Sequence, residues 1–390
     1  MPPLRQAQVG ATHRPAYLPA LDGIRGIAIV WVVLHNTTAL PFTSSSAALS
    51  LILQLGHPGW IGVQLFFALS GFLITAGLLE TRGSAGYFRN FYARRALRIL
   101  PLYYAVLFVL LVVAPRLASG RWPFPTHPQA GLWLFVVNWT HTAPYGFAHF
   151  WSLAVEEQFY LVWPAVVYFC GPRPLLKVCL WISLAALLIR CVLAAFGADP
   201  WTLYTVTPCR MDALAVGAAC ACLLQVPAGR EWVATRSTAI GAASGILFLA
   251  GAALTRLYNT DLWSGETVGY TLLAVSSAML VLSVALPSVG RPNTLTRILS
   301  LLPLRSVGKY SYAMYVFHGL LHKLLGEPLL LAHVGKEPPA GDLLLYSAIV
   351  FAASYALAYL SYHAFERHFL KLKRFFEVPR VSISASPAVS

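Results

Sequence analysis

Charged residues are scarce in this chain, and acidic ones are the scarcest. Only 11% of the 390 residues are Asp, Glu, Lys or Arg, whereas soluble domains average about 25%. The six cysteines form no CxxC pair, which favours packing roles over a metal or redox centre. An internal repeat is also lacking, which argues against a transporter built from inverted halves. This composition excludes a soluble globular domain. It predicts no nucleic-acid partner, because the basic residues stand between apolar runs.

Long apolar stretches are what the chain has in abundance, since 58% of its residues are hydrophobic. A helix needs about 20 apolar residues to cross a bilayer. The sequence therefore predicts an all-α, polytopic membrane protein with a bundle of about ten transmembrane helices. We expect a single domain over 1–375 and a disordered tail over 376–390. The predicted spans are 20–40, 60–80, 99–115, 150–170, 178–196, 209–226, 238–256, 266–287, 309–325 and 342–365.

The basic residues agree with the positive-inside rule when both termini are cytoplasmic. The predicted outside segments then carry few basic residues. This topology requires that the apolar run GLWLFVVNW (131–139), which is too short to span, does not cross. The predicted inside segments are all basic, namely 82–98, 171–177, 230–236, 291–309 and the C-terminal tail.

The stretch LDGIRGIAIVWVVLHN (21–36) places three ionisable groups in the first predicted span. Such groups are costly at membrane depth, so they mark function by default. Asp22 and Arg25 are three residues apart and can pair on one helical face. His35 lies roughly 15 Å further along the helix axis. A neutral imidazole there is a suitable general base for a hydroxyl, although packing alone would also explain it.

Two adjacent carboxylates, Glu156 and Glu157, lie in the segment HFWSLAVEEQFYLVWP (149–164). Neighbours on a helix point about 100° apart, so the two cannot share one role. One could face a water-filled cavity and the other a buried partner. A catalytic role and a structural ion pair with an arginine of another span both remain open.

Three arginines precede the third predicted span in YARRALRILPLYY (92–104), namely Arg94, Arg95 and Arg98. Arginine binds phosphate in a bidentate manner, which suits a nucleotide-bearing donor such as coenzyme A. Topological anchoring would also explain these residues.

Further polar residues lie in two later spans. Arg210 and Asp212 are two residues apart in CRMD and so face different ways, towards other helices or a polar substrate. His318 lies inside the span that contains SYAMYVFH, where a hydrogen-bonded core histidine and a functional one are both compatible with the sequence. No cluster has the spacing of a metal site, so we predict no metal.

Seven motifs occur in order along the chain, and with them it resembles the acyltransferase-3 family of integral membrane acyltransferases from about Leu18 to Arg374. The resemblance implies transfer of an acyl group, often acetyl from acetyl-CoA, to a hydroxyl. The acceptor would be a sugar, a polysaccharide or a natural product such as a macrolide. The motifs are LPALDGIRGIAIVWVVLHN, FFALSGFLIT, FYARRALRILPLYY, HFWSLAVEEQFYLVWP, RMDALAVGA, GKYSYAMYVFH and YHAFERHFLKLKR.

The same resemblance implies roles for residues of this chain. His35 would be catalytic, while Arg25 and the third-span arginines would be the other functional polar groups. The family's histidine follows the arginine by eleven residues, where this chain has Asn36, so His35 lies one position earlier. Acyl-CoA would be a co-substrate rather than a bound cofactor, and the expected location is a bacterial plasma membrane.

From these residues we expect one shared pocket. Acyl-CoA would enter from the cytoplasm onto Arg94, Arg95 or Arg98, with Arg25 as a further donor-binding group. His35 would remove the proton of the acceptor hydroxyl, and a covalent acyl-His35 intermediate stays open as an alternative. The acceptor would be lined by Glu156, Glu157, Arg210 and Asp212. The rival hypothesis is a transporter or flippase for a glycoconjugate, with the same buried charges as a substrate relay.

Overall fold

A computed structural model describes residues 17–38, 42–118, 122, 129–143, 146–260, 262–286, 293–330 and 337–377, without the side chains of 327–330. These residues form helices, and the β-structure among them is one isolated bridge between Thr43 and Pro339. The prediction of an all-α membrane protein is therefore confirmed. The predicted tail lies outside the described residues from position 378 onwards.

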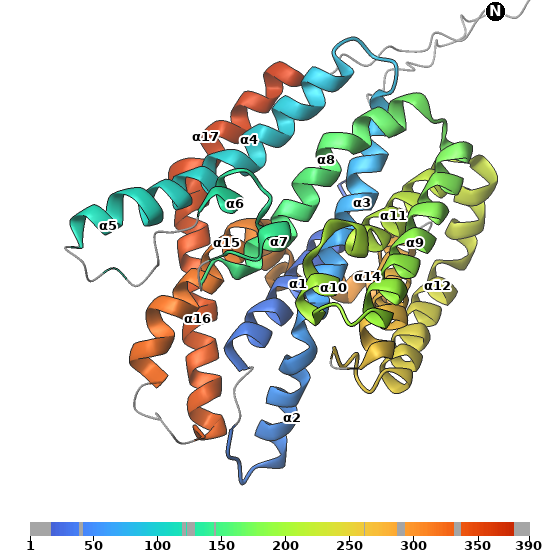
Figure 1. Cartoon of the computed structure of the whole chain (residues 1–390). Coiled ribbons are helices and arrows are strands. Elements are labelled where there is room, and N and C mark those ends of the chain that lie inside the picture. Colours follow the sequence, from blue (N-terminus) through green and yellow to red (C-terminus); the bar gives the residue numbers. More distant parts are fainter. Residues whose placement is uncertain are drawn as a thin grey trace, which may run out of the picture.

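The long helices form a bundle around α1 and α3 (Figure 1), with α9, α11 and α12 on one side and α4, α15 and α16 on the other. Their bounds are α1 Pro19–Thr38, α3 Ile61–Thr81, α4 Tyr87–Phe108, α8 Trp151–Phe169, α9 Pro172–Ala195, α11 Thr207–Gln225, α12 Pro227–Leu254, α13 Tyr270–Val284, α15 Leu302–Leu330 and α16 Ala340–Ser361.

Short helices connect or extend the long ones. They are α2 Ala47–Gly56, η1 His57–Trp60, η2 Val109–Val113, α5 Ala114–Leu117, α6 Ala130–Trp133, α7 Val137–Thr140, η3 Ala148–Phe150, α10 Pro200–Thr205, η4 Gly265–Gly269, α14 Thr294–Leu299, η6 Tyr362–Glu366, α17 Arg367–Lys371 and η7 Leu372–Phe376.

Seven helical stretches in the described chain are long and apolar enough to cross a membrane. The long helices α1, α8 and α15 are not among them. These three carry Asp22 and Arg25, Glu156 and Glu157, and His318, which lower their apolar character. The looser prediction of about ten spans thus corresponds to seven strongly apolar stretches together with three helices that carry candidate site residues.

Two connecting segments differ in informative ways from the sequence-based prediction. The third span was predicted to begin at 99, but α4 already begins at Tyr87, so the arginines over 94–98 lie on the helix rather than in a connector. The run over 131–139 forms the short helices α6 and α7 and does not cross, as predicted. In addition, α2 forms a ten-residue helix within a segment that was predicted only to lie outside.

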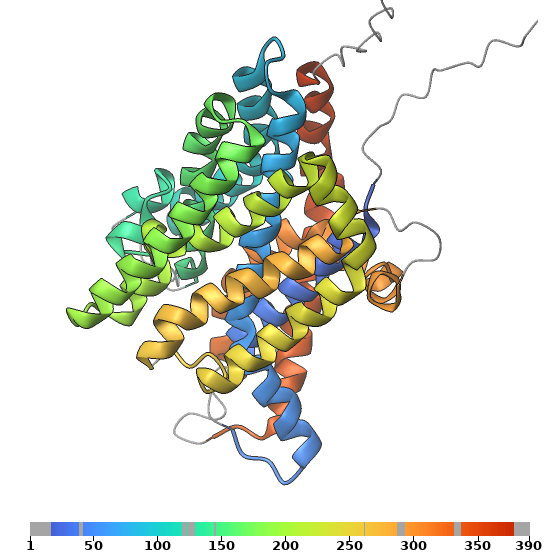
Figure 2. The ribbon, with the colours of Figure 1, turned by 90° about the vertical axis from the view of Figure 1, so that its right-hand side faces the viewer.

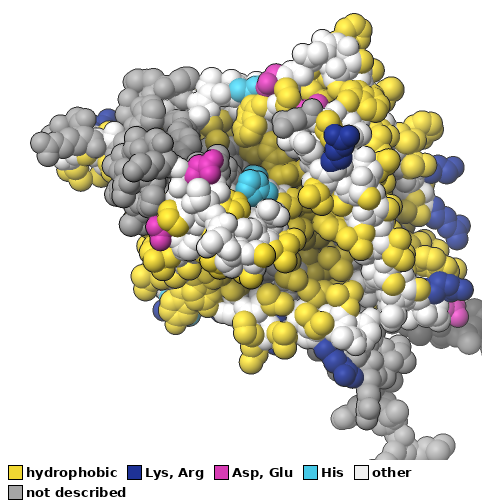
Figure 3. All heavy atoms as spheres, turned by 90° about the horizontal axis from the view of Figure 1, so that it is seen from below, with side chains coloured by type: hydrophobic (Ala, Val, Ile, Leu, Met, Phe, Trp, Pro, Cys, Tyr) yellow, Lys and Arg dark blue, Asp and Glu magenta, His cyan; other side chains and the backbone are white. Residues whose placement is uncertain are grey.

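The C-terminal helices return to the start of α4, with which α17 and η7 are in contact. A view turned by 90° shows α17 beside the first turns of α4 (Figure 2). The opposite end of the molecule carries α2, and there hydrophobic side chains dominate the described surface (Figure 3).

Helix α1 packs against α15 through glycines. A Cβ on Gly23 would overlap the carbonyl of Leu299, and one on Gly26 would overlap the carbonyl of Leu304. In return, a Cβ on Gly308 of α15 would overlap the carbonyl of Asp22. Small residues let membrane helices approach closely. These glycines therefore position the N-terminal half of α1.

Replacing Gly308 with Val is expected to destabilise the protein by about 1–3 kcal/mol, because the two backbones must separate to admit the side chain. Thermal unfolding of the detergent-solubilised protein measures the loss. The matched control is Gly245→Val on α12, where an added Cβ meets nothing within 4 Å. Equal unfolding temperatures for the two variants would contradict the packing argument.

Candidate active site

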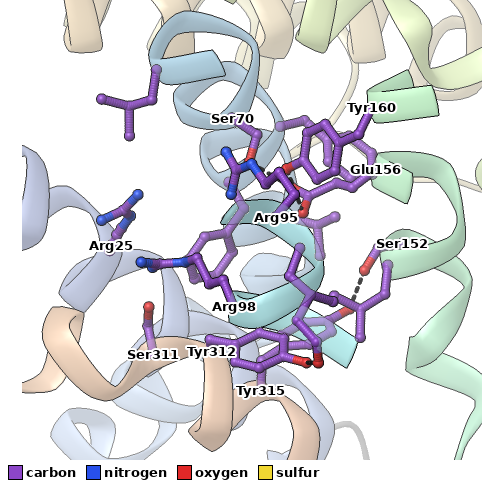
Figure 4. Close-up of a pocket in the computed structure, with 16 residues that line it drawn as sticks. Arg25, Ser70, Arg95, Arg98, Ser152, Glu156, Tyr160, Ser311, Tyr312 and Tyr315 are labelled. Carbon is purple, nitrogen blue, oxygen red and sulfur yellow. Dashed lines mark hydrogen bonds between the residues drawn. The ribbon is translucent and has the colours of Figure 1, made fainter. Parts of the chain in front are cut away.

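A polar cavity of about 90 Å³ lies between α1, α3, α4, α8 and α15 (Figure 4). That volume admits several water molecules, since each needs about 10–15 Å³. Hydroxyl groups and apolar side chains complete its wall. Four sequence-predicted site residues line it together, namely Arg25, Arg95, Arg98 and Glu156.

Glu156 is held in place by two hydroxyl groups. Ser70 Oγ donates to Glu156 Oε1 at 2.7 Å, and Tyr160 OH donates to Glu156 Oε2 at 3.1 Å. The guanidinium of Arg95 lies over the Tyr160 ring, 4.7 Å from its centroid. Figure 4 shows Arg95 beside Ser70, Glu156 and Tyr160. These bonds fix a carboxylate within electrostatic range of an arginine of α4.

Arg25 forms the predicted ion pair with Asp22, at 3.1 Å between Nη1 and Oδ1. Asp22 also accepts a hydrogen bond of 2.5 Å from Tyr17 OH. This bond to the carboxylate raises the pKa of the Tyr17 hydroxyl. Arg95 and Arg98 have no hydrogen-bond partner in the described part of the chain. Two such guanidinium groups on a polar cavity are suited to an anionic ligand.

A second cavity of about 220 Å³ adjoins the first, since both are lined by Arg25, Arg95 and Arg98. Arg94 and Lys373 add two further cations to it. All four predicted donor-binding arginines therefore surround one continuous pair of cavities. We call the first the inner cavity and the second the outer cavity.

His35 lines neither cavity. Its Nδ1 lies 2.5 Å from the carbonyl oxygen of His57. A carbonyl only accepts, so Nδ1 carries the proton and Nε2 keeps a free lone pair. The shared pocket expected for His35 and the two glutamates is therefore wrong. Ten helical residues separate His35 from Arg25 by roughly 15 Å along the axis and turn it by roughly 80°.

Glu157 points away from the inner cavity, as the 100° rule predicted. Its Oε1 is buried and has no hydrogen-bond partner in the described chain. The pair does not act as one acceptor site, because only Glu156 reaches the inner cavity.

Asp212 belongs to a buried ion pair with Arg190 of α9, at 2.7 Å between Oδ2 and Nη2, and both side chains are fully buried. Thr271 also donates to Asp212. Arg190 further donates to the carbonyl oxygens of Cys209 and Thr267. Asp212 therefore joins α9, α11 and α13, which confirms the expected bond to another helix. It lines neither the inner nor the outer cavity.

Arg210 faces a different way from Asp212. Its guanidinium has no hydrogen-bond partner within the described residues. Aromatic rings surround it, with centroids at 4.4 Å for Tyr270, 5.1 Å for Tyr204 and 5.6 Å for Trp151. Cation–π contacts thus take the place of the expected hydrogen bonds to other helices.

His318 is fully buried in α15. Its Nδ1 lies 2.7 Å from the carbonyl oxygen of Tyr315, whereas Nε2 has no partner among the described residues. The ring of His149 lies 4.6 Å away. His318 does not line the inner or the outer cavity, so the structure separates it from the arginines.

Sequence reasoning did not name several residues that matter here. Arg190 could have been found, because an ionisable side chain inside a predicted span signals function or a buried pair. Ser70, Tyr160 and Tyr315 carried no such signal, because hydroxyl groups are common in membrane helices. Lys373 was read only as a topological signal, and its place on the outer cavity depends on the return of the C-terminal helices.

Comparison with known proteins now identifies the family. A family model described as an acyltransferase domain, Acyl_transf_3, matches residues 18–363. The peptidoglycan O-acetyltransferase OatA of Listeria monocytogenes is 27% identical over 324 residues, covering 77% of this chain and 49% of the relative. The O-acetyltransferase OatA of Staphylococcus aureus is 26% identical over 339 residues, covering 78% and 51%.

The chain spans about half the length of the curated relatives it matches. No solved structure matches it. The match covers the helices that build both cavities, from α1 to α16. The chain therefore belongs to the acyltransferase-3 family of integral membrane acyltransferases.

Proposed function

We propose that this protein transfers an acyl group, most simply acetyl, from acyl-CoA to a hydroxyl of a glycan polymer. The observation that carries the donor proposal is the pair of cavities surrounded by four arginines, of which Arg95 and Arg98 have no hydrogen-bond partner in the described chain. Phosphate groups are suited to bidentate contacts with such side chains. The names of the relatives support acetyl as the acyl group and a peptidoglycan-like glycan as the acceptor.

In this proposal the donor enters by the outer cavity and extends its thioester through the inner one towards His35. A volume of about 90 Å³ admits the narrow acyl end and excludes the nucleotide, which stays in the outer cavity. Glu156 keeps Arg95 oriented and the passage hydrated. The protein would lie in a bacterial plasma membrane with both termini in the cytoplasm, so that the donor comes from the side of the basic segments.

His35 acts as the general base. Its Nε2 has the free lone pair, because Nδ1 donates to His57. Nε2 takes the proton of the acceptor hydroxyl while the oxygen attacks the thioester carbonyl. A carbon–oxygen bond forms, the carbon–sulfur bond breaks, and the proton on His35 passes to the departing thiolate of coenzyme A. Acyl transfer through Nε2 itself is the covalent alternative.

The test is an assay of the purified protein with acetyl-CoA and a hydroxyl-bearing glycan. We expect free thiol and an acetylated glycan, whereas a transporter or flippase would produce neither. Arg98→Met should raise the KM for acetyl-CoA about 10- to 100-fold, since a hydrogen bond to a charged group contributes about 1.5–3 kcal/mol. The control is Arg89→Met, which lies on α4 but on neither the inner nor the outer cavity. An unchanged KM in Arg98→Met would refute the donor site.

A further inference from the structure

The outer cavity has one cation that comes from the far end of the chain. Lys373 lies in η7, beyond the residues matched by the family model, which end at 363. The segment reaches the cavity because α17 and η7 pack on α4, as Figures 1 and 2 show. Lys373 is half-buried there, whereas its neighbours Lys371 and Arg374 are exposed.

Placing Lys373 at this position is electrostatically unfavourable without a ligand. It lies within range of Arg94, Arg95 and Arg98, all of the same sign. No carboxylate forms an ion pair with it in the described chain. Like charges in a half-buried site repel more strongly than in water, because the local dielectric is lower. A ligand with several negative charges would turn this repulsion into attraction.

We propose that Lys373 binds a phosphate group of the donor's nucleotide end, so that the C-terminal segment forms part of the donor site. This inference rests on the proposed function and extends it to a residue outside the family match. Arg25, Arg94, Arg95, Arg98 and Lys373 together hold the phosphates of acyl-CoA in the outer cavity. The phosphate of an anionic lipid headgroup has the same chemistry, so the experiment must separate the two sources.

The experiment compares full-length wild type with Lys373→Met in detergent, with coenzyme A as the probe in calorimetric titration and acetyl-CoA in the assay. We expect coenzyme A to bind about tenfold more weakly and the KM for acetyl-CoA to rise by the same factor, with kcat unchanged. Lys373→Arg should retain most of the affinity. The matched control, Lys371→Met, should equal wild type. Should Lys373→Met fail to fold, Lys373→Gln replaces it.

The outcomes separate this inference from the proposed function. Equal affinity of wild type and Lys373→Met for coenzyme A overturns the role of Lys373 and leaves the donor proposal standing. Wild type that binds no coenzyme A overturns both. Nanodiscs with and without phosphatidylglycerol test the lipid source. If Lys373→Met weakens only the effect of that lipid, the residue is a headgroup site and the inference fails.

Discussion

Replacing His35 with Gln is expected to lower the kcat of acyl transfer by about 10²- to 10⁴-fold, the usual contribution of a general base. Gln can still donate to the carbonyl of His57 but has no nitrogen that accepts a proton. The donor contacts lie elsewhere, so the KM for acetyl-CoA should change little. Steady-state assays of the purified variant measure both constants.

The control for His35 is His57→Ala. The His57 side chain is exposed, and only its backbone carbonyl accepts the bond from His35. This variant should retain its activity. Near wild-type kcat in a folded His35→Gln protein would sink the general-base role. A burst of free coenzyme A without acceptor in wild type, absent from the variant, would favour the covalent route.

Replacing Asp212 with Ala is expected to destabilise the protein by about 3–5 kcal/mol, because it leaves the charge of Arg190 buried without its partner. Both side chains are fully buried, and the pair links α9 to α11. The loss should be visible as a lower thermal unfolding temperature and a smaller monodisperse yield in detergent.

Two comparisons separate loss of the ion pair from a general effect of the substitution. Asp199→Ala removes an exposed aspartate ahead of α10 and should unfold like wild type. The double variant Arg190→Met with Asp212→Ala removes both charges and should recover much of the lost stability, since breaking a buried pair costs more than replacing it. A double variant no more stable than Asp212→Ala would contradict this account.

The family, the all-α membrane fold and the Asp22–Arg25 pair could all be predicted from the sequence. Periodicity and apolar length determine where helices form, and the spacing of three residues determines that pair. The grouping of Arg94, Arg95 and Arg98 was equally visible, because one helix presents residues three or four apart on one face. These are local properties, which depend on neighbours along the chain.

Contacts between distant helices were decided only by the tertiary structure. It separated His35 from Glu156, paired Asp212 with Arg190, surrounded Arg210 with aromatic rings and brought Lys373 to the arginines of α4. The physical reason is that a sequence shows which groups are too polar for lipid, but not which of them meet. That depends on how closely the helices approach, as at Gly308 and Asp22, and on the rotation of each helix in the bundle.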